Sequence, residues 1–100
     1  MTGLEARSTR VAERIRAKLS AALAPERLAV IDESHRHAGH AGAAPGGETH
    51  FRVEIVAAAF AGVSRLARQR RVYAILADEL AAGVHALALV TLAPGEAKRD

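Results

Sequence analysis

The clearest strand in the chain is THFRVEIV (residues 49–56), and the rest of the fold can be predicted around it. Phe51, Val53 and Ile55 alternate with charged residues, which is the period of two that a half-buried strand requires. One face of this strand is therefore expected in the core and the other in water. The whole chain has 100 residues and no cysteine, so we expect a single domain that folds without disulfides.

Two elements are predicted before this strand. In residues 8–25, Val11, Ile15 and Leu19 recur every four positions among basic residues, which predicts an amphipathic helix that ends before the proline. The apolar and β-branched residues of RLAVIDES (residues 27–34) then predict a strand of about six residues. It should end at one of the two acidic residues of this segment.

A helix and a strand are predicted after the strand of residues 49–56. Residues 64–83 form a helical pattern in which Ser64 caps the start and Gly83 ends the helix. The apolar stripe of this helix is Leu66, Tyr73, Leu76 and Leu80. Residues 84–92 are apolar at nearly every position, which suits a strand covered on more than one side.

The element order is therefore α-β-β-α-β, an α+β fold with a three-stranded mixed sheet whose apolar face is covered by both helices. The first two strands are expected to be antiparallel, and the last two parallel, because a helical crossover separates them. We place the domain at residues 8–92, after a flexible N-terminus of residues 1–7. It contains a long loop at residues 35–48, and a charged tail at residues 93–100 is expected to be disordered.

Composition restricts the functional classes. The net charge of +3 and the sequence pI of 10.2 permit contact with nucleic acid or an acidic protein face and require neither. No window reaches the roughly 18 apolar residues of a membrane span, and the N-terminus lacks the apolar core of a secretory signal. We therefore expect a cytoplasmic protein without membrane contact. No nucleophile motif, phosphate loop or closed metal triad indicates an enzyme.

Histidine is concentrated in IDESHRHAGHAG (residues 31–42), which holds His35, His37 and His40. Without cysteine, this chain can bind soft metals only through imidazole or through thiols of a partner. Two alternatives stay open: a solvated loop that is rich in imidazole, or a weak trap for zinc or nickel. His85 opens the last strand, and its position on an apolar strand by itself favours a core histidine bonded to a backbone carbonyl over a ligand. We interpret His50 as structural.

Arginines open the second predicted helix, and two of them share one side at i, i+3 spacing. Such residues could contact the phosphates of DNA. They could also form a solvated face of the helix or one half of a protein interface. The Gly-x-x-Gly loop with which KH domains clamp nucleic acid has no counterpart before this helix, where the sequence is AAFAGVSRL. The four candidates for nucleic-acid or partner contact are Arg65, Arg68, Arg70 and Arg71.

Four segments, in this order and with these separations, resemble the BolA family: IDES, GGETHFRVEIV, FAGVSRLARQRRVYAILADEL and GVHALALVTL. The resemblance is specific because a strand with ETHF, a helix with R-x-R-x-VY and LADEL, and a strand opened by VHAL occur together. It implies a domain of the class II KH-like type without enzymatic activity. It also implies a partnership with monothiol glutaredoxins, a shared bridging 2Fe-2S cluster, and links to iron homeostasis and transcription regulation.

By this resemblance, the histidine of VHAL is His85, which corresponds to a cluster ligand of the family. The second ligand of the family comes from the loop between the first two strands. Counting forward from DES favours His37, whereas counting back from ETH favours His40. We place His40 first, His37 second and His35 third.

The resulting prediction is a BolA-like adaptor that binds a monothiol glutaredoxin with glutathione and co-ligates a 2Fe-2S cluster through His85 and one loop histidine. Iron in a two-iron cluster accepts imidazole in place of thiolate, as Rieske centres show. The cluster is expected to be absent from the isolated protein, which we expect to be a monomer with self-association left open. The alternative is a DNA-binding transcriptional regulator that uses the basic helix.

Overall fold

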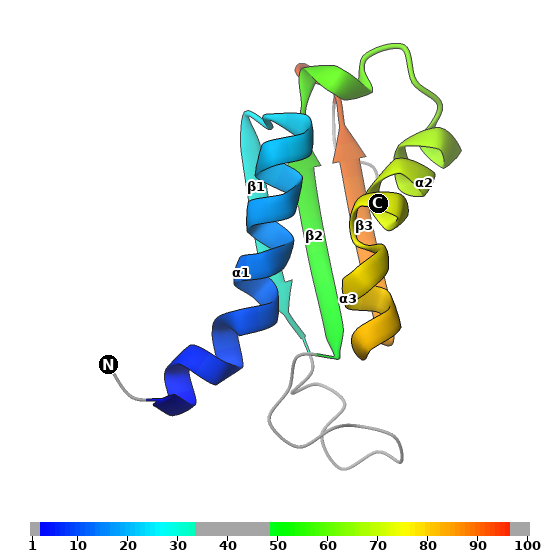
Figure 1. The fold of residues 1–100 in the computed structure, drawn as a ribbon. Helices are drawn as coiled ribbons and strands as arrows, with labels where there is room; N and C mark the ends of the chain where they lie inside the picture. The colour runs from blue at the N-terminus through cyan, green and yellow to red at the C-terminus, as the bar shows by residue number, and fades with distance from the viewer. Residues whose placement is uncertain (1–2, 34–48, 97–100) are drawn as a thin grey trace.

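The computed structural model describes residues 3–33 and 49–96 (Figure 1). The predicted order of elements is confirmed, except that the second helix is divided into two. Helix α1 begins earlier than residue 8, where we place the start of the domain. The elements are α1 (Gly3–Leu23), β1 (Arg27–Asp32), β2 (His50–Val56), a 3₁₀ turn (Ala58–Phe60), α2 (Arg65–Ile75), α3 (Ala77–Ala82) and β3 (Ala86–Leu92).

The strand predicted from THFRVEIV, β2, is the centre of a three-stranded sheet with the order β1-β2-β3. β1 runs antiparallel to β2 and places Leu28 opposite Ile55. β3 runs parallel to β2 and places Leu89 opposite Val53. Both predicted pairings are confirmed. The parallel pairing is possible because α2 and α3 supply a crossover long enough to return the chain to the same end of the sheet.

One face of the sheet forms the core. Phe51, Val53 and Ile55 of β2 are at most 2% exposed, as their alternation predicts. The helices cover this face of the sheet (Figure 1), and α1 contributes Ile15 and Leu19, which are fully buried. The four-residue apolar spacing of α1 therefore describes its packing face correctly.

The opposite face of the sheet is not covered by any described helix (Figure 1). On this face, Arg52 pairs with Glu54 of the same strand, with 2.9 Å between Nε and Oε2. Ala86 and Ala88 of β3 are exposed. The prediction that the last strand is covered on more than one side is therefore wrong. β3 is an edge strand, and its small side chains on the open face tolerate contact with water.

The division of the second helix occurs at Leu76, which ends α2 and precedes α3. Ser64 caps α2 as predicted, because its Oγ accepts a hydrogen bond from the Ala67 N–H at 3.1 Å. Gly83 ends α3 with a φ of 145°, a backbone conformation that favours glycine. Both predicted ends of the helical segment are therefore confirmed.

The buried side of this helical segment differs from the predicted stripe. Two of the four predicted residues, Leu66 and Tyr73, are 56% and 41% exposed, respectively. The other two are confirmed, because Leu76 is buried and Leu80 packs against the core. The displacement arises because two charged side chains turn inward to make polar contacts, which apolar periodicity does not count. The buried residues of α2, α3 and their junction are Arg68, Val72, Leu76 and Glu79.

Within residues 3–33 and 49–96, no helix has the combination of length and apolar character needed to cross a membrane.

Candidate functional site

The three strands meet at one end of the sheet, which we call the histidine end. β1 stops there at Asp32, and β2 and β3 begin there at His50 and Ala86. The register places His50 opposite Ala86, so His85 directly precedes the paired part of β3. Two histidines from distant parts of the chain are therefore brought to the same end of the sheet.

The main chain of His85 is held in place by Thr49. The N–H groups of His85 and Ala86 both donate to the Thr49 carbonyl, at 2.7 and 3.2 Å. The preceding residue, Val84, is 7% exposed, and its N–H donates to the Glu79 carbonyl at 3.1 Å. The His85 side chain is exposed. The fold thus presents an accessible imidazole on a fixed backbone, rather than the buried core histidine that the sequence left open.

His50 is the neighbour of His85. The centroids of the two rings are 6.2 Å apart, and the ring planes are tilted by 36°. His50 is half-buried, and its Nδ1 lies 2.9 Å from Thr49 Oγ1. We interpreted His50 as structural from the sequence, and its proximity to His85 was missed. Only the register of the parallel pair reveals it, because that register places His50 opposite Ala86, the residue after His85.

The loop histidines His35, His37 and His40 lie outside the described residues. The residues on either side of this segment are described, and both lie at the histidine end. The Glu33 N–H donates to the His50 carbonyl at 2.8 Å, and the Thr49 carbonyl accepts from His85. The described residues that flank the segment 34–48, Glu33 and Thr49, therefore lie next to His50 and His85.

Among the described residues, no group of three or more histidine, cysteine, aspartate or glutamate side chains is arranged to hold a metal ion. The described part of the histidine end therefore offers two imidazoles, His50 and His85. Any further protein ligand would have to come from the segment 34–48 or from a partner.

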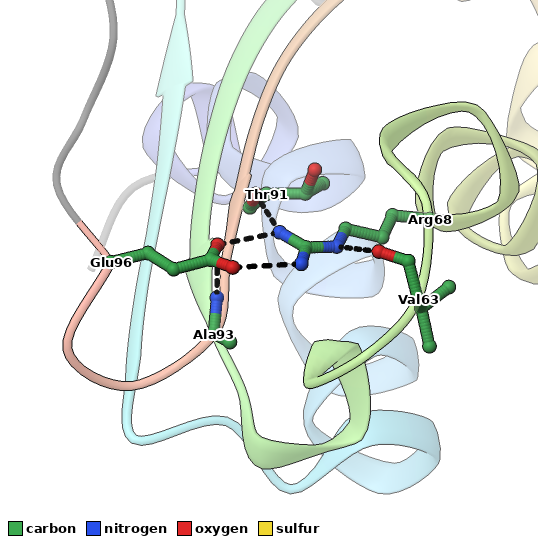
Figure 2. Close-up of polar contacts among 5 residues, drawn as sticks. All are labelled: Val63, Arg68, Thr91, Ala93 and Glu96. Carbon is green, nitrogen blue, oxygen red and sulfur yellow. Dashed lines mark hydrogen bonds and ion pairs between the residues drawn. The ribbon is translucent and has the colours of Figure 1, made fainter.

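Arg68 lies inside the fold, although its i, i+3 spacing from Arg71 predicts a shared exposed side. Its side chain is 7% exposed, and its guanidinium lies between the start of α2 and the end of β3 (Figure 2). Nε donates to the Val63 carbonyl at 2.8 Å, and Nη1 donates to the Thr91 carbonyl at 2.9 Å. The ring of Phe60 lies below it, 5.7 Å from Cζ to the centroid. Arg68 is therefore not available on the surface for nucleic acid or a partner.

Glu96 completes the contacts of Arg68 (Figure 2). The guanidinium donates to both carboxylate oxygens, at 2.7 and 3.0 Å, and the Ala93 N–H donates to Oε1 at 2.9 Å. This pair fastens the turn after β3 to α2. The tail predicted to be disordered from residue 93 is therefore ordered as far as Glu96, and residues 97–100 lie outside the described part of the chain.

The Arg68 contact also predicts how stability depends on pH. The hydrogen bonds from the Arg68 guanidinium, and then from the Ala93 N–H, lower the pKa of Glu96 from 4.5 to about 2. Because the folded-state pKa is depressed, this contribution to stability is present above pH 4.5 and is lost as the pH falls toward 2. We expect the melting temperature of Glu96→Gln to fall less steeply than that of the wild type over this range. Parallel curves for the two proteins would contradict the assignment.

The three other arginine candidates, Arg65, Arg70 and Arg71, are exposed on α2. They are the part of the predicted basic surface that the structure leaves accessible. Because Arg68 is buried, the predicted i, i+3 pair of Arg68 and Arg71 is not present on the surface of α2.

Comparison with known proteins agrees with this architecture. Residues 19–96 match the family of BolA-like proteins. The chain belongs to the BolA family. The histidine end and the α2 arginines are therefore features of a BolA-like domain, and the resemblance seen in the sequence is confirmed.

Individual relatives match most of the chain. A Sinorhizobium protein, named only as an uncharacterized protein in the cobS 5′ region, is 54% identical over 87% of this chain and 95% of its own length. Human BolA-like protein 1 is 49% identical over 82% of this chain, which spans 57% of the human protein. The solved BolA domain of SufE1 from Arabidopsis thaliana superposes with a TM-score of 0.76 at 47% identity, covering 85% of this chain and 93% of that domain.

Proposed function

We propose that this BolA-family chain is a non-enzymatic adaptor that binds a monothiol glutaredoxin and co-ligates a bridging 2Fe-2S cluster, in iron-sulfur cluster trafficking or iron regulation. The observation that supports this proposal is the setting of His85. Its imidazole is exposed and its main chain is fixed by Thr49, the residue that directly follows the segment with the loop histidines. An exposed ligand on a fixed backbone is suited to a metal centre that is shared with a second protein.

The chemistry of the available donors fits such a cluster. The chain has no cysteine, so its ligands to iron would be imidazole nitrogens. His85 would supply one, and His40, or else His37, would supply the other from the segment 34–48. When bound, the cluster would supply an iron atom that accepts imidazole in place of thiolate. This replacement of thiolate by imidazole raises the reduction potential of the cluster. The cysteine of the glutaredoxin and the thiol of glutathione would hold the other iron.

The partner would also need a docking surface on the chain. The exposed arginines Arg65, Arg70 and Arg71 could meet an acidic surface of the glutaredoxin or the carboxylates of glutathione. Because glutathione and reduced thiols are required, we place the complex in the cytoplasm. We take the isolated protein to be monomeric and without the cluster.

Anaerobic cluster reconstitution tests this proposal. A monothiol glutaredoxin with glutathione is reconstituted alone and with the wild-type chain, and the visible absorption and circular dichroism spectra are compared. We expect the wild type to change the cluster spectrum and His85→Ala to abolish that change, because the iron loses a fixed imidazole. Among His40→Ala, His37→Ala and His35→Ala, the variant that behaves like His85→Ala identifies the second ligand.

Far-UV circular dichroism and thermal unfolding of each variant provide the control, since His85 is exposed and its truncation should leave the fold intact. An unchanged glutaredoxin spectrum in the presence of the wild type would refute cluster sharing. The alternative, a DNA-binding regulator, would then be tested by gel shift. That function requires Arg65, Arg70 and Arg71, and replacing all three with alanine should weaken DNA binding strongly and reduce its salt dependence.

A further inference from the structure

His50 and His85 lie at the start of two neighbouring parallel strands, with their ring centroids 6.2 Å apart. Two imidazoles bound to one zinc ion at about 2.0–2.1 Å in tetrahedral geometry place their centroids roughly 5 Å apart. The observed separation is close to this value. Because the His85 side chain is exposed, rotation about its side-chain bonds can close the remaining gap without moving the backbone.

We propose that His50 and His85 form a two-imidazole binding site for a divalent transition-metal ion, of which Zn²⁺ is the probe, on the isolated chain. This site goes beyond the proposed function, because it needs neither a glutaredoxin nor a cluster. It shares His85 with that function, so a bound ion would compete with cluster ligation.

Thr49 prepares both histidines for this role. Its Oγ1 lies 2.9 Å from His50 Nδ1, and its carbonyl accepts the main-chain N–H of His85 at 2.7 Å. When Nδ1 carries the proton and donates to Oγ1, Nε2 is the basic nitrogen that can bind a metal. A hydrogen bond from the second ring nitrogen to an oxygen is the usual outer contact of a metal-binding histidine, where it sets the tautomer and orients the ring.

The surroundings determine what kind of ion fits. Imidazole suits zinc, copper and nickel, whereas Mg²⁺ and Ca²⁺ prefer oxygen ligands. The described residues contain no group of three potential ligands, so the remaining coordination positions would be taken by water at this exposed edge. A two-histidine site of this kind should bind zinc and discriminate against magnesium.

Calorimetric titration of the isolated chain with ZnCl₂ near neutral pH tests the proposal. We expect His50→Ala and His85→Ala each to weaken zinc binding about tenfold or more. The matched control is the triple variant His35→Ala/His37→Ala/His40→Ala, which should keep the wild-type affinity within about twofold. Thr49→Val keeps both imidazoles but loses the Oγ1 contact, and we expect it to weaken binding about tenfold.

Other results would overturn the proposal. It fails if the wild type does not bind zinc, if the triple variant loses the affinity, or if the two single variants bind like the wild type. His50→Gln, which retains most of the side-chain volume, replaces His50→Ala if the latter unfolds, and the same loss is expected. The zinc titration contains no glutaredoxin, so a negative result would not contradict cluster sharing. A negative cluster reconstitution would likewise not contradict the zinc site.

Discussion

Replacing Arg68 with methionine is expected to lower the free energy of unfolding by about 3 kcal/mol. The substitution keeps an apolar stem in a position that is 6% exposed but removes every donor of the guanidinium. The carbonyls of Val63 and Thr91 then lose their side-chain partner, and the Glu96 carboxylate loses both hydrogen bonds from the guanidinium but keeps the one from the Ala93 N–H. Chemical denaturation followed by circular dichroism measures the change.

Arg70 provides the matched control for this prediction, because it lies in the same helix and is exposed. Arg70→Met should change stability by no more than about 0.5 kcal/mol. Arg68→Lys should recover only part of the loss, since an ammonium group cannot donate to two carboxylate oxygens and two carbonyls in the fork geometry of arginine. If Arg68→Met and Arg70→Met unfold at the same denaturant concentration, Arg68 does not have the structural role assigned to it.

Replacing Glu79 with alanine is expected to lower the free energy of unfolding by about 2 kcal/mol. The Glu79 side chain is 2% exposed, and it joins α3 to α1 through two cations. Arg14 Nη2 lies 3.1 Å from Oε2, and Lys18 Nζ donates to Oε1 at 2.9 Å. The hydrogen bond to Glu79 also raises the pKa of Lys18. Alanine removes both ion pairs and leaves a void between the helices.

The neighbouring acidic residue, Asp78, serves as the control for Glu79. Asp78 Oδ2 lies 3.5 Å from Lys18 Nζ, but its side chain is 84% exposed. Asp78→Ala should therefore change stability by no more than about 0.5 kcal/mol, because exposed ion pairs contribute little. Equal shifts of the denaturation midpoint for Asp78→Ala and Glu79→Ala would show that burial does not determine the contribution of this pair.

Arg68 and Glu79 also show why apolar periodicity predicted the buried side of residues 64–83 only in part. Apolar periodicity describes α1 and β2 correctly, since their core positions are occupied by aliphatic or aromatic side chains. In α2 and α3, the inward positions include Arg68 and Glu79, which periodicity assigns to the surface. The predicted stripe was therefore displaced toward Leu66 and Tyr73. A charged residue is buried only where specific partners satisfy it, and those partners belong to other elements.

The candidate site was also predicted only in part from the sequence. The resemblance of VHAL to the BolA family was sufficient to select His85, and strand prediction was sufficient to place it at the start of the last strand. The nearness of His50 could not be predicted from either, because it depends on which residues of β2 and β3 are paired. The assignment of His40, His37 or His35 as a cluster ligand stays a prediction, since all three lie outside the described residues.

The amino-acid sequence alone was sufficient to predict the three strands, the helical segments, the antiparallel and parallel pairings, and the BolA-like identity of the domain. These follow from patterns that repeat every two to four residues and from the order of short motifs. Two features are visible only once the chain is folded: Arg68 fastens the last turn to α2, and His50 and His85 share the histidine end. The physical reason is that the neighbours of a side chain depend on strand register and on the crossover between strands, which bring together residues far apart in the chain.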